Sequence, residues 1–289
     1  MKKERFDFIC SLGSSCLCAT SLRDAGLRLS SGPFDWVLGP SLLKRVELIA
    51  NDFAGWFEHD DFELLGSREK VEHDNYANRR TGYTFPHEFD FGRPFDECYP
   101  AVRAKYDRRI ARFYERIRAS RRVLLVWLEN PVADDRPSDE DVAASLKVLA
   151  GKFPGVTVEL LVVDRAPDDT SGGELVRMDG YWRVTCPYRR KATEAGKDVR
   201  PWDIDTHPIQ SILADFSAND YRSAEARRSH AQKSRQAKYA MFGAHGAIGY
   251  AVARVQVKVC KLLLNRLRRK GVEMRRVFEL QFREQECEG

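Results

Sequence analysis

Short apolar runs separate stretches of helical periodicity over the first 217 residues. The runs Phe6–Leu12, Val123–Leu128 and Val156–Val163 are almost continuously apolar, which is typical of parallel strands that are buried on both faces. A fourth, shorter strand is predicted at Tyr181–Thr185. These runs together predict a sheet whose strands are mostly parallel.

Between the apolar runs, apolar residues recur at the spacing of one helix face. A helix is predicted over 16–25, where Gly26 follows as a C-terminal stop signal. Strands alternating with helices in this order predict an α/β fold in which helices flank a mostly parallel sheet. The other predicted helices run from Ser41 to Ala50, over about 101–119, from the capping pair Ser138 and Asp141 to about Leu149, and from Thr206 to about Phe216.

Residues 51–99 show little clean periodicity of either kind. They are rich in Asp, Glu, His, Asn, Phe and Tyr. A connection of this length without regular structure is uncommon in a compact domain, and long connections of this kind often carry function. We therefore interpret this segment as an irregular functional insert.

Charged residues are distributed unevenly between the first 217 residues and the rest of the chain. The 289 residues are 43% hydrophobic and 31% charged, which is typical of a globular protein, and the net charge is +5. Residues 218–289 carry 16 Lys and Arg against 7 Asp and Glu, whereas residues 1–217 carry 32 against 36. We therefore predict an α/β catalytic domain at 1–217 and a basic, amphipathic helical tail at 218–289.

The tail has the pattern of a helix that docks on an acidic surface. Lys and Arg alternate with Val and Leu over 254–276, so an anionic membrane surface or an acidic partner protein would fit it. A solvated helix that packs on the body is an equal alternative. Recognition of a nucleic-acid groove fits the pattern less well.

Cysteine usage and hydropathy predict a cytoplasmic protein. Seven Cys are scattered without a C-x-x-C pair, which favours reduced thiols over a disulfide framework. We expect no secretion signal and no membrane-spanning helix, because no sufficiently long apolar segment occurs. A peripheral position at the inner face of the membrane would follow if the tail binds lipid.

The first candidate constellation lies where the first strand passes into a helix. Ligands of open α/β sheets bind at the carboxyl ends of the strands, and a helix N-terminus stabilises a thiolate there. We therefore predict Cys16 as a nucleophile, with Ser14 and Ser15 beside the substrate and the N–H groups of 15–17 as an oxyanion hole. A buried structural cysteine is the alternative interpretation.

The second constellation lies at residues 74–89. His87 has a pKa range suited to proton transfer, and a carboxylate from Asp35, Asp90 or Asp96 would orient it, with Asp35 preferred. Arginine forks bind carboxylate or phosphate groups, and amides add hydrogen bonds. The predicted substrate-binding residues of this segment are Asn75, Asn78, Arg79 and Arg80.

The spacing of the ligating residues favours neither a metal site nor a nucleotide cofactor. His and Asp are concentrated between residues 59 and 87, but no H-x-x-x-H or C-x-x-C spacing occurs among them. The phosphate-binding patterns G-x-G-x-x-G and G-x-x-x-x-G-K-[ST] are also absent. We therefore predict no metal and no cofactor.

Several motifs resemble a bacterial family described as papain-like cysteine peptidases, otherwise a domain of unknown function. The similar segments are S-L-G-S-S-C, L-R-D-A-G-L-R, P-F-D-W, N-Y-A-N-R-R and F-P-H-E-F, within about residues 6–165. The resemblance implies a hydrolase with a nucleophilic Cys16 and a general-base His87. It also suggests a connection with cell-surface polysaccharide metabolism.

The resulting hypothesis is a thiol hydrolase or acyl transferase with a Cys–His pair. Its substrate would be a small molecule, a peptide or a glycan. One alternative is a serine esterase of the SGNH type, with Ser14 or Ser15 as nucleophile and Asp205 and His207 as partners. Another is a non-catalytic protein that binds a glycan or sugar phosphate through Arg79 and Arg80.

Overall fold

The computed structural model describes residues 3–67, 73–166, 172–189 and 204–225, together with 227–229 and 232. Contacts between residues divide the chain into 1–221 and 222–289, and the description below concerns the first of these units. The basic helix predicted at 254–276 lies outside the described residues.

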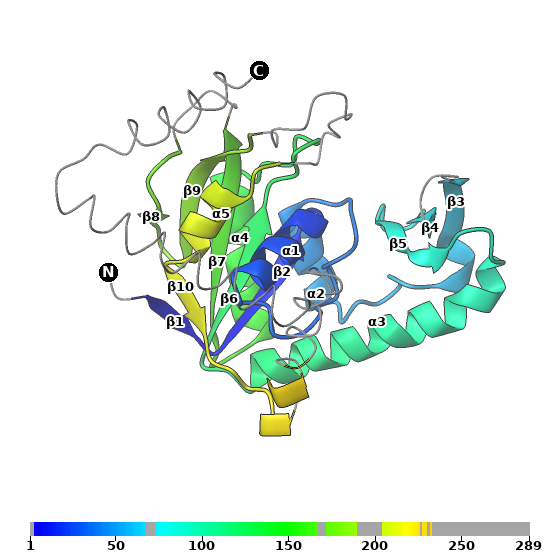
Figure 1. Ribbon diagram of the computed structural model, residues 1–289, viewed down its shortest axis with the longest axis horizontal. Coiled ribbons are helices and arrows are strands. Elements are labelled where there is room, and N and C mark those ends of the chain that lie inside the picture. Colours follow the sequence, from blue (N-terminus) through cyan, green and yellow to red (C-terminus); the bar gives the residue numbers. More distant parts are fainter. Residues whose placement is uncertain are drawn as a thin grey trace, which may run out of the picture. The chain divides into compact units, whose positions relative to one another are not determined.

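The first unit is built around a five-stranded, mostly parallel sheet, which confirms the predicted α/β class (Figure 1). The strand order is β2-β6-β7-β9-β8, and only β8 runs antiparallel to its neighbour. The strands are β2 (Phe8–Gly13), β6 (Arg122–Leu128), β7 (Thr157–Ala166), β8 (Val176–Arg177) and β9 (Tyr181–Pro187).

Each face of this sheet is covered by helices, because alternate residues of its strands point to opposite sides. In β6, Leu125 and Trp127 belong to one apolar core, whereas Leu124 and Val126 belong to the other. Helices α2, α3 and α4 contribute to the first core, and α1 and α5 to the second. These helices are α1 (Cys16–Asp24), α2 (Leu42–Ala50), α3 (Phe95–Arg118), α4 (Asp139–Lys152) and α5 (His207–Leu213).

The predicted start of α4 is confirmed in atomic detail. The Ser138 hydroxyl accepts a hydrogen bond from the Asp141 backbone N–H at 3.1 Å. The Asp141 carboxylate accepts one in return from the Ser138 N–H at 3.4 Å. Two N–H groups that the helix itself leaves unpaired are thereby satisfied, so this capping box determines where α4 begins.

The segment predicted to be an irregular insert instead forms a three-stranded antiparallel sheet. Its order is β3-β4-β5, and register shifts interrupt both pairings, between Leu64 and Gly66 and between Asp74 and Tyr76. Each shift breaks the two-residue alternation that identifies a strand in a sequence, which explains why the prediction was wrong. The elements are the 3-10 helix η1 (His59–Asp61) and strands β3 (Phe62–Ser67), β4 (His73–Asn78) and β5 (Thr84–Asp90).

Aromatic packing attaches this small sheet to α3. Phe57 stacks on Tyr106 with ring centres 4.9 Å apart, and Phe85 meets the same ring edge-on at 5.7 Å. Helix α3 begins at Phe95, earlier than predicted, and includes Pro100 near its start. Helix α3 also packs against β5, so α3 and β5 can contribute side chains to one site.

The first predicted strand is divided in two. Asp7 accepts hydrogen bonds from the backbone N–H groups of Arg121 and Arg122, at 2.9 and 3.0 Å, and interrupts the strand. Strand β1 (Glu4–Phe6) therefore pairs in parallel with β10 (Phe216–Ala218) rather than continuing into β2. The pairing also explains why the last predicted helix ends before Phe216.

None of the helices in the described part of the chain combines the length and the apolar character needed to cross a lipid bilayer.

Candidate active site

Cys16 is the first residue of α1 and directly follows the turn after β2. It is half-buried, whereas the other cysteines of the described residues are buried. Its sulfur faces the backbone N–H groups of Cys16 itself and of Leu17. Cys16 is therefore the most exposed residue among the described cysteines, and it lies where the predicted nucleophile was expected.

The pKa of the Cys16 thiol differs from the expectation. Burial raises the pKa of this thiol, and the two backbone N–H groups offset the effect only in part. The expected lowering by the helix N-terminus is thus outweighed by the loss of hydration. A thiol with a raised pKa stays protonated near neutral pH, so its use as a nucleophile requires a base.

Ser14 joins the nucleophile turn to the end of β6. Its backbone N–H and its hydroxyl both donate to the Leu128 carbonyl oxygen, each at 3.1 Å. The Ser14 side chain is fully buried and Ser15 is nearly so, and Ser15 occupies the N-cap position of α1. The Ser14 hydroxyl is therefore engaged in the fold.

Arg45 donates hydrogen bonds to the backbone of the same turn, and the sequence analysis did not identify this residue. This fully buried side chain on α2 donates to the carbonyl oxygens of Leu12 at 2.7 Å, Ser14 at 3.3 Å and Pro40 at 3.1 Å. A Cβ atom at Gly13, whose φ is +114°, would lie 2.1 Å from an Arg45 guanidinium nitrogen. Gly13 therefore leaves the space that the guanidinium group occupies.

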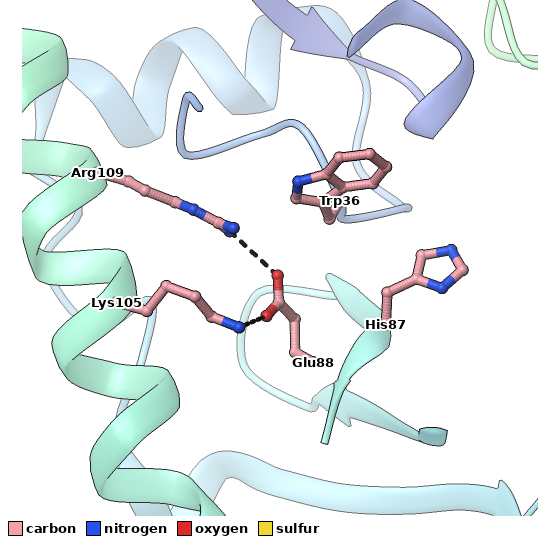
Figure 2. A pocket seen from close by; sticks show the side chains of 5 residues that line it. All are labelled: Trp36, His87, Glu88, Lys105 and Arg109. Carbon is pink, nitrogen blue, oxygen red and sulfur yellow. Dashed lines mark hydrogen bonds and ion pairs between the residues drawn. The ribbon is translucent and has the colours of Figure 1, made fainter. Parts of the chain in front are cut away.

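His87 lies on β5 and is exposed. Its ring meets the Trp36 ring edge-on, with centres 6.3 Å apart, and the His73 ring at the same distance. An antiparallel bridge between Leu38 and Thr84 aligns the segment that contains Trp36 with β5. The bridge explains how Trp36 and His87 come to lie side by side, as Figure 2 shows.

Asp35, the predicted orienting carboxylate, is fully buried beside Trp36 in the sequence. Its Oδ2 accepts hydrogen bonds from Arg28 at 2.6 Å and from the Gly32 N–H at 2.9 Å. Burial raises the pKa of Asp35, and Arg28 partly offsets this. Arg28 in turn lies over the Trp36 ring, 5.5 Å from its centre, so Asp35 supports the ring that contacts His87.

A pocket of about 340 Å³ lies between β5 and α3 (Figure 2). It is lined by Trp36, His87, Glu88, Lys105 and Arg109. Figure 2 shows Lys105 and Arg109 extending from α3 toward Glu88, with Trp36 and His87 on the other side. The predicted general base therefore lies on the wall of a polar pocket.

Glu88 is the buried anion of this pocket. Its Oε1 accepts hydrogen bonds from the Tyr106 hydroxyl at 2.9 Å and from Arg109 at 3.0 Å. Its Oε2 forms an ion pair with Lys105. The Arg109 guanidinium also lies over the Tyr106 ring, 4.9 Å from its centre.

The predicted arginines of the β4–β5 turn have partners within the chain. Arg79 donates to the backbone oxygen of Asp60 at 2.7 Å, and Arg80 forms an ion pair with Asp61 at 2.5 Å. Both arginines are exposed. Their contacts join the turn to η1.

The two predicted asparagines differ in their surroundings. Asn78 is fully buried; it donates to the Trp56 carbonyl at 3.0 Å and accepts from the N–H and hydroxyl of Thr81, which closes the β4–β5 turn. Asn75 is half-buried, and its side-chain oxygen has no hydrogen-bond partner within the described residues.

The acid–histidine pair considered for a serine esterase is local and exposed. Asp205 accepts hydrogen bonds from the backbone N–H of His207 at 3.0 Å and from its ring at 2.8 Å. The His207 side chain is 94% exposed at the start of α5. Within the described residues, no group of three or more His, Cys, Asp or Glu is placed to hold a metal ion.

The positions of Arg45 and Arg109 in the sequence could have indicated that both side chains are buried. Arg45 follows Leu42 by three residues and precedes Ile49 by four, so it lies on the apolar stripe of its helix. Arg109 stands in the same relation to Tyr106 and Phe113. A charged residue on an apolar stripe must find buried partners, and both arginines do.

The fold and the site together define an α/β protein with an accessible cysteine at a helix N-terminus, after the first strand of its parallel sheet. Residues 7–163 match a family described as "Putative papain-like cysteine peptidase (DUF1796)", and the chain belongs to this family. The matched range contains Cys16, Asp35 and His87.

The chain is also similar to the uncharacterized protein R408 of Acanthamoeba polyphaga mimivirus. The two are 26% identical over 179 residues, which make up 56% of this chain and 79% of the viral protein. No solved structure matches the chain.

Proposed function

We propose that the protein is a thiol hydrolase or acyl transferase in which Cys16 is the nucleophile and His87 the general base. The observation that carries this proposal is the position of Cys16. It combines access to solvent, the first position of α1 and the carboxyl end of a parallel strand. Membership of the peptidase-like family supports a cysteine-dependent reaction.

The raised pKa of Cys16 gives His87 a defined task. His87 takes the thiol proton while the Cys16 sulfur attacks the acyl carbon, and the protonated imidazole then donates that proton to the leaving group. A thioester with Cys16 remains, and water or another acceptor releases the acyl group. The N–H groups of Cys16 and Leu17 would stabilise the oxyanion formed at each stage.

Two contacts support the choice of cysteine over serine, one buried and one exposed. The Ser14 hydroxyl already donates to Leu128 and is fully buried, so it would have to break a hydrogen bond to react. Asp205 and His207 form an exposed local pair at the start of α5, in which the Asp205 carboxylate accepts the backbone N–H and the ring of His207. The thiol therefore suits nucleophilic attack better than the Ser14 hydroxyl.

The test uses p-nitrophenyl acetate as a general acyl donor, with acylation of Cys16 followed by mass spectrometry. We expect acetylation of Cys16 in the wild type and none at residue 16 in Cys16→Ala. His87→Ala should slow acylation by about 100-fold, the lower range for loss of a general base. The matched control is His207→Ala, an exposed histidine outside the proposed site, which should acylate at the wild-type rate.

Equal rates in the wild type and in His87→Ala would contradict the role of His87. Acylation at other residues only, with Cys16 unmodified, would contradict the whole proposal. Chemical unfolding of each variant separates a change in chemistry from a loss of fold.

A further inference from the structure

We propose that the pocket beside His87 binds an anionic group of the substrate, either a carboxylate or a phosphate. The reaction would then favour acyl substrates that carry such a group near the reacting bond. The statement about substrates rests on the proposed function, whereas anion binding by the pocket stands on the contacts of α3 and β5.

The charges of the pocket do not cancel. Lys105 and Arg109 provide two cations, and Glu88 provides one carboxylate. The buried Asp35 carboxylate also interacts with Arg109, but it is paired with Arg28, so one positive charge remains in excess. Glu88 engages one nitrogen of each cation. Within the described residues, Arg109 donates hydrogen bonds to Glu88 alone, so the rest of its guanidinium fork has donors to offer a ligand.

Burial increases the effect of this excess charge. The side chains of Glu88 and Arg109 are 2% and 10% exposed, so water screens their charges weakly. Lys105 is more accessible, at 36%, and lies at the rim, where its flexible ammonium group can move between Glu88 and a ligand. An anion entering from solvent would thus meet Lys105 first and Arg109 deeper in the pocket.

Shape and lining suit a small anionic group attached to a larger molecule. The volume of about 340 Å³ is at the lower end of the range for ligand pockets. Trp36 supplies an apolar wall, and His87 lies next to it. A ligand anchored by its anion at α3 would therefore extend past Trp36 toward His87.

The charge of Glu88 allows us to predict the direction in which anion affinity changes when this residue is replaced. Its carboxylate competes with any ligand anion for Lys105 and Arg109. In Glu88→Gln the amide oxygen can still accept from Tyr106 and Arg109, but the competing negative charge is gone. This variant should therefore bind anions more tightly than the wild type, an effect that a purely structural role of Glu88 would not produce.

The test is a ligand-observed NMR titration with benzoate, phenyl phosphate and neutral benzamide. These probes share a ring that can contact Trp36 and differ in charge and anion type. We expect saturable binding of an anion, with benzamide at least about tenfold weaker, because a charge-assisted hydrogen bond contributes about that factor. Tighter binding of phenyl phosphate would assign a phosphate group, and tighter binding of benzoate a carboxylate.

Two variants and a matched control complete the design. Lys105→Met should weaken anion binding by about tenfold, and Glu88→Gln should strengthen it. Lys44→Met is the control, because Lys44 forms an exposed pair with Glu47 on α2 and should not affect binding. Equal binding of all three probes, or anion affinities that neither Lys105→Met nor Glu88→Gln changes, would overturn the proposal.

Cys16→Ala separates this proposal from the catalytic one. If this variant binds the anion like the wild type while the wild type shows no acylation of Cys16, the pocket stands and the catalytic proposal fails. If Cys16 is acylated but the anions bind no better than benzamide, the pocket fails and the catalytic proposal stands.

Discussion

The structure buries two arginines among its described residues, Arg45 and Arg109, and they have different kinds of partner. Arg45 donates only to backbone carbonyl oxygens, and its guanidinium lies over the rings of Phe34, Tyr83 and Trp127. Arg109 shares a buried carboxylate, Glu88, with Lys105.

This difference in partners indicates that Arg45 stabilises the fold, whereas Arg109 can also bind a ligand. The carbonyl oxygens around Arg45 belong to the turn before Cys16 and to the segment before α2, so this cation connects two pieces of backbone. The Glu88 carboxylate neutralises only one of the two cations on α3, so that group keeps positive charge facing a pocket. We expect changes at Arg45 to affect stability, and changes around Arg109 to affect binding as well.

The largest effect is expected from Arg45→Met. The apolar side chain fills the space but leaves the buried carbonyl oxygens of Leu12 and Ser14 without their donor. We expect the free energy of unfolding to fall by about 3 kcal/mol, since each buried group left unpaired costs about 1–3 kcal/mol. Urea-induced unfolding followed by circular dichroism measures this change.

Arg23→Met is the control for that variant. Arg23 forms an exposed pair with Asp24, and loss of such a pair changes stability by about 0.5 kcal/mol or less. Similar stability of Arg45→Met and the wild type would show that the turn does not depend on this cation.

A smaller effect is expected from Arg109→Met. Glu88 then keeps Tyr106 and Lys105 as partners, so the free energy of unfolding should fall by about 2 kcal/mol, below the usual cost of breaking a buried pair. In the double variant Arg109→Met with Glu88→Gln, part of this loss should be recovered, because the remaining group is no longer charged.

Urea-induced unfolding of the two single variants and the double variant compares their free energies of unfolding. Additive losses in the double variant would mean that Arg109 and Glu88 stabilise the fold independently, which would contradict the contact between them.

The smallest effect concerns an exposed ion pair at the start of α3. Hydrogen bonds from His59 to Asp60 and Asp96, at 2.9 and 2.7 Å, raise the pKa of His59 above its ordinary value. Because the folded-state pKa is the higher one, this stabilisation is complete below about pH 6.5, the value for an unfolded chain. It is lost as the pH rises through the folded-state pKa.

An NMR titration of the His59 ring tests this assignment. Asp96→Asn should lower the His59 pKa. Asp107→Asn, which removes a carboxylate paired with Arg103 further along the helix, should leave it unchanged. A His59 titration that is insensitive to Asp96 would show that the pair does not form in solution.

The parts of the fold that the sequence predicted well are those with uninterrupted signals. Strand β6 reads as an apolar run because both of its faces are buried, and α4 begins at a capping box visible as Ser138 and Asp141. Strands β3, β4 and β5 were missed because bulges break their alternation. Asp7 divided the first strand through contacts with Arg121 and Arg122, which no local pattern shows.

The sequence likewise predicted only part of the candidate site. Cys16 could be located because a strand, a glycine and a helix start follow one another directly. The pocket could not, because Trp36, Glu88 and Arg109 meet only after α3 packs against β5. The pKa of Cys16 was expected to fall because the helix N-terminus is a local feature, whereas burial, which raises it, depends on the whole fold.

The hydrogen bonds from Ser14 to the Leu128 carbonyl oxygen affect the order in which parts of the protein fold. The two residues are 114 positions apart, so the turn before Cys16 is complete only after a long loop has closed. Parallel pairings between such distant segments form slowly, because chain entropy is lost before contacts compensate for it. During refolding, we therefore expect Cys16 to remain open to oxidation after local elements such as α4 have formed.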